Sequence, residues 1–167
     1  TTGPAGVSSK MTSAQAIAAL AYGTESIPYV FKITGPGNQY VAEAKRQVYG
    51  QVGIDSVAGP SEIVILCSVP ANTEYLARDL LSQAEHDPEA RALLITTRRD
   101  QARAVQARLE ALIPALPRTE IIAASFAGGS AIMIVDALEA GIEIVNEIAP
   151  EHLSLSVDNP FEYIEKV

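Results

Sequence analysis

The chain has little of several features that mark particular classes of protein. Its 167 residues include a single cysteine, Cys67, and no tryptophan. One cysteine excludes a disulfide framework of the kind that holds small secreted domains together, and fits a reducing compartment such as the cytoplasm. Because Cys67 lies inside the apolar run of residues 63–67, we expect a buried thiol with no reactive role.

Long apolar runs and clusters of positive charge are also missing. No run approaches the roughly 20 apolar residues that a bilayer-spanning helix needs, and no basic-then-apolar stretch resembles a signal peptide. The formal net charge is −8, and Lys and Arg do not cluster. We therefore expect neither a nucleic-acid partner nor a membrane partner.

The composition that remains is typical of one globular domain. Hydrophobic residues make up 48% of the chain and charged residues 19%. Residues 1–11, rich in Thr, Gly, Ser and Pro, are expected to form a flexible leader, either native or added in cloning. Residues 12–167 are expected to form a single domain.

Helical and strand-like patterns alternate along the chain. Apolar spacing and capping residues predict helices over residues 14–22, 39–49, 72–87, 100–113 and 136–149. The last of these begins at Asp136, with Glu139 three residues on as in a capping box. Strands are predicted over residues 29–33, 63–67, 92–96, 119–123, 131–135 and 153–157. This order predicts a Rossmann-like α/β fold, with a mainly parallel sheet and helices on both faces.

Two glycine-containing turns are candidate ligand loops. Gly-Pro-Gly-Asn at residues 35–38 follows a predicted strand and opens a helix, a place suited to a phosphate or carboxylate. It is not a G-x-G-x-x-G fingerprint, so a tight turn without a ligand stays open. Gly-Pro-Ser-Glu at residues 59–62 precedes a strand, and Ser61 is either a substrate contact or part of a simple turn.

Both histidines of the chain stand beside other polar side chains. Gln83 and His86 are three residues apart near a helix end, so we expect both on one face. They are either metal ligands, or His86 interacts favourably with the dipole at the end of the helix. Glu151 and His152 follow Pro150, at the start of a strand. They supply either a base and an acid for catalysis or a solvated charged pair.

Together these segments are similar to histidinol dehydrogenases. The matching segments are residues 14–24 (AQAIAALAYGT), 35–38 (GPGN), 59–62 (GPSE), 82–87 (SQAEHD) and 149–153 (APEHL). They occur in the family's order and spacing, and the resemblance covers residues 14–160. It implies a cytoplasmic homodimer that oxidises L-histidinol to L-histidine through the aldehyde, the last step of histidine biosynthesis, with two NAD per turnover and a bound zinc ion (Zn2+).

The resemblance also implies a role for individual residues. His152 is the general acid–base, and Glu151 activates water for the second oxidation. Ser61 contacts the substrate. Gln83 and His86 bind zinc, which holds the substrate. The cofactor contacts are Gln15 and Asn38.

The chain departs from the family in length and in ligands. Family members are more than twice as long, and only two of four zinc ligands match here. The chain alone is therefore expected to be inactive and to hold zinc weakly or not at all. The alternatives are a catalytically silent α/β scaffold domain and an unrelated small-molecule binding module. Because ligands gather at the carboxyl ends of parallel strands, we expect the substrate and catalytic residues around one cleft there.

Overall fold

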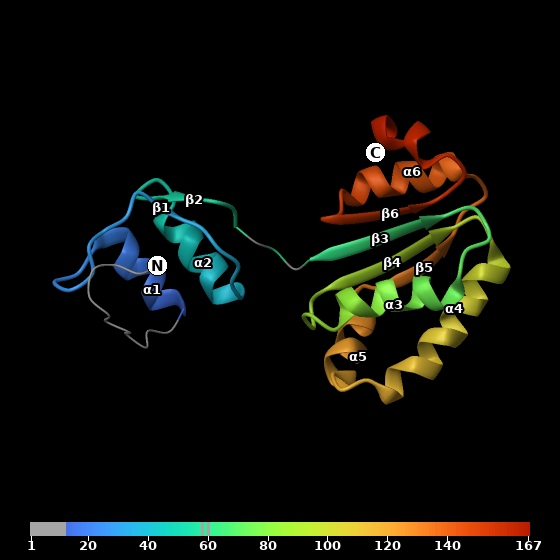
Figure 1. The fold of residues 1–167 in the computed structure, drawn as a ribbon, viewed down its shortest axis with the longest axis horizontal. Helices are drawn as coiled ribbons and strands as arrows, with labels where there is room; N and C mark the ends of the chain where they lie inside the picture. The colour runs from blue at the N-terminus through green and yellow to red at the C-terminus, as the bar shows by residue number, and fades with distance from the viewer. Residues whose placement is uncertain (1–12, 58, 60) are drawn as a thin grey trace. The chain divides into compact units, whose positions relative to one another are not determined.

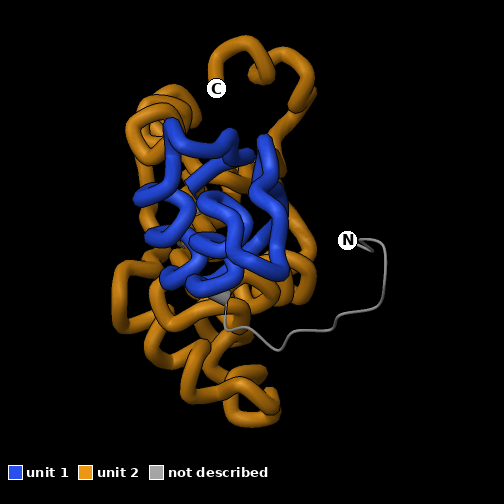
Figure 2. The backbone as a smooth tube through the Cα atoms, turned by 90° about the vertical axis from the view of Figure 1, so that its left-hand side faces the viewer, with its two compact units in different colours: residues 1–59 blue, residues 60–167 orange. Residues whose placement is uncertain are grey.

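The computed structural model describes residues 13–57, 59 and 61–167. The chain divides into two units, Thr1–Gly59 and Pro60–Val167, which Figure 2 colours separately. The predicted leader lies outside the described residues, and so does Thr12, a candidate cap of the first helix. The sequence predicts one domain over residues 12–167, and that boundary stays a prediction.

The first unit pairs two helices with a minimal sheet. Helix α1 (Ser13–Tyr22) ends at Gly23, where a φ of 77° favours glycine and the Gly23 amide donates to the Ala19 carbonyl at 2.9 Å. Strand β1 (Lys32–Ile33) pairs in parallel with β2 (Gly53–Ile54), and α2 (Gln39–Val48) lies between them in the chain. The helices bury a small core consisting of Ile17, Ala21, Ile33, Val41, Val48 and Val52.

The strand predicted over residues 29–33 is longer than the one observed. Only Lys32 and Ile33 pair, and their partner β2 escaped prediction. Tyr29 and Phe31 are exposed, because the two-residue ladder covers neither of them. A partner as short as β2 has no alternation of apolar and polar residues that a sequence pattern could detect.

The second unit is built on a four-stranded parallel sheet. The strands are β3 (Glu62–Cys67), β4 (Arg91–Thr96), β5 (Ala131–Ile134) and β6 (His152–Ser156), in the order β5-β4-β3-β6 (Figure 1). The register places Glu62 opposite Arg91 and Ile63 opposite His152. The sheet thus joins β3 to β6, a strand from the far end of the unit.

Helices cover both faces of this sheet. Helices α3 (Thr73–Ala84), α4 (Arg99–Leu112) and α5 (Thr119–Gly128) pack on one face, and α6 (Leu138–Ile148) packs on the other (Figure 1). Ile65 points to the three-helix face and Leu66 to α6, as the alternation of a strand requires. The short 3-10 turns are η1 (Ile113–Ala115), η2 (Pro160–Glu162) and η3 (Ile164–Lys166). The predicted α/β class, with a parallel sheet and helices on both faces, is confirmed.

Two predictions about local structure are wrong. Residues 119–123 form the start of α5 and not a strand. Ile122 and Ser125 are both fully buried at helical spacing, and the Ser125 hydroxyl donates to the Ala90 carbonyl at 2.7 Å. Tertiary packing thus overrides the β-like sequence. Helix α6 begins at Leu138 after Ala137, without a side-chain cap, so the capping box at Asp136 does not form.

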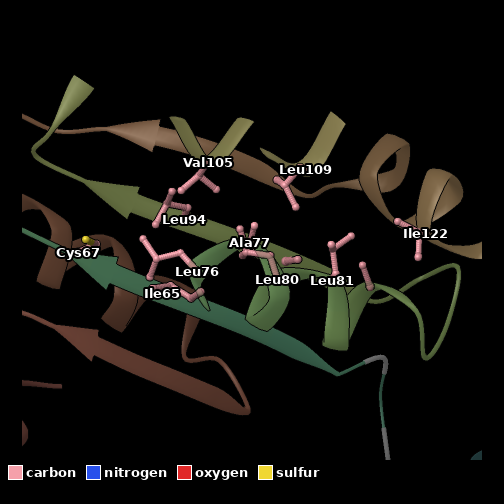
Figure 3. Packing of buried hydrophobic residues seen from close by; sticks show 12 residues of the cluster. Ile65, Cys67, Leu76, Ala77, Leu80, Leu81, Leu94, Val105, Leu109 and Ile122 are labelled. Carbon is pink, nitrogen blue, oxygen red and sulfur yellow. The ribbon is translucent and has the colours of Figure 1, made fainter. Parts of the chain in front are cut away.

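Cys67 is buried in the core, as predicted. Its side chain lies fully inside the cluster shown in Figure 3, among residues of β3, β4, α3 and α4. The Sγ atom donates to the Val69 carbonyl at 3.3 Å. Burial raises the pKa of the thiol, which disfavours the reactive thiolate. Cys67 therefore has a packing role.

Glu74 joins α3 to α4 through two arginines. One carboxylate oxygen accepts from Arg78 Nε at 2.6 Å, within α3, and the other accepts from Arg108 Nε on α4. The hydrogen bond from Arg108, followed by that from Arg78, lowers the pKa of Glu74 from 4.5 to about 2. A folded-state pKa below the unfolded value stabilises the fold above that unfolded value, and the stabilisation is lost as pH falls through the folded pKa.

Replacing Glu74 with glutamine should therefore lower stability only where the carboxylate is charged. We expect the free energy of unfolding of Glu74→Gln to fall below that of the parent chain near neutral pH. The difference should shrink as pH drops from 4.5 towards about 2. Urea unfolding at a series of pH values measures it, with Glu143→Gln, at an exposed position on α6, as the control. A difference that stays constant over this range would contradict the assignment.

Candidate functional site at the amino end of the sheet

The sequence-predicted site residues of the second unit gather at one end of its sheet. Ser61 directly precedes β3, and its carbonyl accepts from the Arg91 amide at the start of β4, at 3.3 Å. His152 is the first residue of β6 and lies opposite Ile63. Gln83 stands in the last turn of α3, which runs back along the sheet and leads into β4. Segments about ninety residues apart in the chain thus meet here.

This end is the amino end of the strands, so the expected location at the carboxyl ends is wrong. Strand β3 starts at Glu62, β4 at Arg91 and β6 at His152, and all run in parallel. The rule for open α/β sheets places ligands at the opposite end. The sequence itself carried this signal, because Ser61 precedes one predicted strand and His152 stands at the start of another. In a parallel sheet both positions lie at the amino end.

The register also fixes the face on which His152 lies. Registered partners in a parallel pair point to the same face of a sheet, and Ile63 packs against the cluster under α3. The next residue, Leu153, packs on the α6 face. His152 therefore lies on the face that α3 covers, the face that also carries Gln83.

Glu151 and His152 approach each other after the end of α6. Helix α6 stops at Ala149, which adopts a left-handed conformation with φ 47°, and Pro150 follows. The turn places the Glu151 Oε1 atom 3.9 Å from His152 Nε2, with both side chains more than half exposed. The two groups are thus close enough to act on one ligand and open enough to receive it. A base and an acid that act on one substrate need to reach it together, and this arrangement allows that.

Gln83 and His86 differ in their surroundings. Gln83 is buried, with 8% of its surface exposed, whereas His86 is exposed. Helix α3 ends at Ala84, and the His86 amide donates to the Gln83 carbonyl at 3.1 Å in the turn that follows. His86 therefore lies on the turn after α3. The prediction that Gln83 and His86 share one helical face is wrong, because the helix ends at Ala84.

Gln15 and Asn38, the predicted cofactor contacts, belong to the first unit. Gln15 is exposed on α1. The Asn38 oxygen caps α2 by accepting from the amides of Tyr40 at 3.1 Å and Val41 at 3.2 Å. With its oxygen committed to the helix, Asn38 has its NH2 group to offer a ligand, as a donor.

The loop before Asn38 needs its glycines. Gly35 has a φ of 136°, a region that side chains other than glycine rarely adopt. A Cβ atom at Gly37 would lie 2.4 Å from the side chain of Val41. The loop of residues 35–38 therefore packs tightly against the first turn of α2.

The sequence analysis did not predict an ion pair beside this loop, between the buried Lys45 and the more exposed Asp55. Lys45 lies on the buried stripe of α2 together with Val41, Ala42 and Val48, and its Nζ atom is 2.6 Å from Asp55 Oδ1. A lysine on an otherwise apolar helical stripe is the sequence signal that could have found it, since lysine is rarely buried unless paired.

A hollow in the first unit contains none of the predicted site residues. Its volume is about 400 Å³, and it is lined by residues 29–31 and 49–53. Neither Gln15 nor Asn38 faces it. The hollow therefore adds nothing to the candidate site.

Comparison with known proteins decides the family. The family model described as histidinol dehydrogenase matches residues 5–167. The chain belongs to the histidinol dehydrogenase family. Histidinol dehydrogenase of Halalkalibacterium halodurans is 52% identical over 95% of the chain and 37% of that protein. The enzyme of Chlorobium chlorochromatii is 50% identical over 98% of the chain and 39% of that protein.

A solved histidinol dehydrogenase shares the fold. The crystal structure of the enzyme from Elizabethkingia anophelis matches with a TM-score of 0.86 and 39% identity, over 92% of the chain and 35% of that structure. The chain thus spans little more than a third of the length of these histidinol dehydrogenases. Within the described residues, no helix is long and apolar enough to cross a membrane.

The residues present do not by themselves make a zinc site. Structural and catalytic zinc sites use at least three protein ligands, and Gln83 with His86 supplies two neutral donors. Among residues 13–57, 59 and 61–167, no group of three or more His, Cys, Asp or Glu side chains is placed to hold a metal ion. Zinc binding by this histidinol dehydrogenase chain thus requires ligands from outside it.

Proposed function

We propose that the protein containing this chain oxidises L-histidinol to L-histidine, with two NAD per turnover, in the cytoplasm and as a homodimer. The observation that supports this most is the meeting of Ser61, Gln83 and the Glu151–His152 pair at one end of the sheet, in a chain of this family. The balanced reaction consumes the alcohol, one water and two NAD+, and yields the carboxylate, two NADH and three protons.

In the first step His152 takes the proton of the substrate hydroxyl. The hydrogen of the adjacent C–H bond then leaves with both bonding electrons as hydride, for which bound NAD+ would supply the acceptor. Removal of the hydroxyl proton raises the electron density on oxygen and so makes hydride departure easier. The exposure of the His152 side chain, 56%, leaves room for the substrate beside it.

In the second step Glu151 takes a proton from water, whose oxygen adds to the aldehyde carbon, while His152 returns its first proton to the aldehyde oxygen to give the hydrate. His152 then removes a proton from the resulting hydrate while the second hydride leaves. The side chains of Glu151 and His152 are 3.9 Å apart, so both can reach groups on the same carbon of the substrate. Ser61 contacts the substrate, and Gln15 and Asn38 contact NAD.

Gln83 and His86 contribute two ligands to a zinc ion whose remaining ligands lie outside this chain. The ion would hold the substrate's amine and imidazole. We assign no step of the oxidation to it, since two donors do not define its position.

The test uses the full-length protein. Purified protein supplied with NAD+ and histidinol should form NADH, followed by absorbance, and should yield two NADH for each histidinol consumed. One NADH per histidinol would contradict the second oxidation. No NADH above a blank would favour the alternative of a binding module or a silent scaffold.

A further inference from the structure

Lys45 is buried in the first unit and makes its contacts to one loop and one carboxylate. Only 4% of the residue is exposed. Its Nζ atom donates to the Gly35 carbonyl at 2.6 Å and to Asp55 Oδ1 at 2.6 Å. A lysine so placed loses most of its hydration, so its partners have to compensate for that loss.

Asp55, which follows β2, also bonds to Gly35, at its amide. Its Oδ2 atom accepts from the Gly35 amide at 2.8 Å, and its Oδ1 atom also accepts from the Ser56 amide at 2.8 Å. The Gly35 amide, followed by the Lys45 ammonium, holds the pKa of Asp55 well below its usual range. The carboxylate is therefore charged at any physiological pH.

Both backbone groups of Gly35 are thus held, one by each member of the ion pair. Gly35 opens the loop of residues 35–38 in a conformation with φ 136°. At the other end of this loop, the Asn38 side chain is bonded to the first turn of α2. With both ends fixed, the loop has little freedom, and the direction of the Asn38 NH2 group is set.

We propose that Lys45 and Asp55 are positioning residues, which hold the loop of residues 35–38 in the conformation that presents Asn38 to NAD. This inference rests on the proposed function, in which Asn38 contacts the cofactor. A pair that served stability alone would need contacts only between α2 and β2. Here both partners also bond to Gly35, so the loop itself is what they hold.

The central experiment replaces Lys45 with methionine in the full-length protein. Lys45→Met removes the charge and the donor to Gly35 while keeping a side chain of similar length. We expect the KM for NAD to rise about tenfold or more, because one charge-assisted hydrogen bond contributes about that factor. The kcat at saturating NAD and the KM for histidinol should stay close to the parent values.

Two further variants complete the experiment. Arg46→Met removes the neighbouring charge on α2, whose partner Glu43 is exposed, and should leave the KM for NAD unchanged. Asp55→Asn keeps an acceptor for the Gly35 amide but leaves the buried Lys45 ammonium without its carboxylate, so it should raise the KM for NAD as Lys45→Met does. It also serves if Lys45→Met fails to fold.

The outcomes separate positioning from stability. If Lys45→Met lowers the melting temperature but leaves the KM for NAD unchanged, the proposal is wrong. It is also wrong if kcat falls and the KM for histidinol rises as much as the KM for NAD does. Asn38→Ala should raise the KM for NAD as well. If it does not, while Lys45→Met does, the pair acts on something other than Asn38 and the proposal is wrong.

Failure of the proposed function would look different. In that case the parent protein would form no NADH from histidinol. Calorimetric titration with NAD then replaces kinetics: weaker binding by Lys45→Met than by Arg46→Met supports the positioning role, and equal binding overturns it.

Discussion

In the full-length protein, which we propose oxidises histidinol, replacing His152 with asparagine should slow both oxidation steps by about 10²–10⁴-fold, the range that a general acid–base usually contributes. Asparagine keeps a polar side chain at the start of β6 but does not take up a proton near neutral pH. Because a hydroxyl proton has to leave in each step, both steps depend on the imidazole. Rapid mixing of the enzyme and NAD with histidinol, and separately with histidinal, measures the two steps independently.

Glu151→Gln should divide the two steps instead. The alcohol step needs no water, so we expect it to keep most of its rate. The aldehyde step should fall by about 10²-fold or more, because glutamine does not activate water. Glu147→Gln, at an exposed position near the end of α6, is the control and should leave both rates unchanged. Equal slowing of the two steps by Glu151→Gln would remove the water-activating role.

Truncation of Ile65 to alanine should cause a large loss in the free energy of unfolding. Ile65 is fully buried in β3, packed among Leu76, Leu80 and Leu94 in the cluster of Figure 3. Removal of three buried carbons leaves a cavity that the surrounding sheet and helix close only in part. The expected cost is about 2–5 kcal/mol in the free energy of unfolding.

Hydrogen exchange of the β3 and β4 amides measures this cost within the second unit, independently of the unfolding of the first unit. Ile65→Val is the matched control, since it removes one carbon and should cost about 0.5–1.5 kcal/mol. A loss from Ile65→Ala no larger than that from Ile65→Val would mean that Ile65 is not packed as described.

The sequence predicted well where a segment carries its own signal. The short apolar run of residues 63–67, rich in β-branched residues, favours a buried strand, and β3 spans Glu62–Cys67. Asn72, at the start of the helix predicted over residues 72–87, accepts from the Glu74 amide at 2.9 Å as the cap of α3. In both cases the local chemistry and the packing ask for the same structure.

Predictions failed where the answer depends on distant parts of the chain. Ile122 belongs to a helix because α5 packs on the sheet, although its neighbours favour a strand by residue type. The pairing of β1 with β2 depends on two short segments with weak patterns. Lys45 and Asp55 are ten residues apart, and nothing in either residue alone shows that both bond to Gly35.

The candidate site was found by residue type, and its location was not. Gln83, His86, Glu151 and His152 stand out as groups that can bind metals or move protons. Their place before or at the start of predicted strands already indicated the amino end of a parallel sheet. That Ser61 and His152 lie on neighbouring strands depends on the pairing of β3 with β6. That pairing is a tertiary fact, and the usual rule for parallel sheets pointed to the other end.

The adjacency of β3 and β6 makes the assembly of the site depend on a contact between distant parts of the chain. Ile63 and His152 become neighbours only after a loop of nearly ninety residues closes, whereas β3, α3 and β4 meet through short connections. Closure of so long a loop has a high entropic cost, so contacts of this kind tend to form late. A chain still lacking its final strand would hold Ser61 and Gln83 in place without the acid–base pair. The proposed acid–base pair would then reach Ser61 and Gln83 only when β6 docks beside β3.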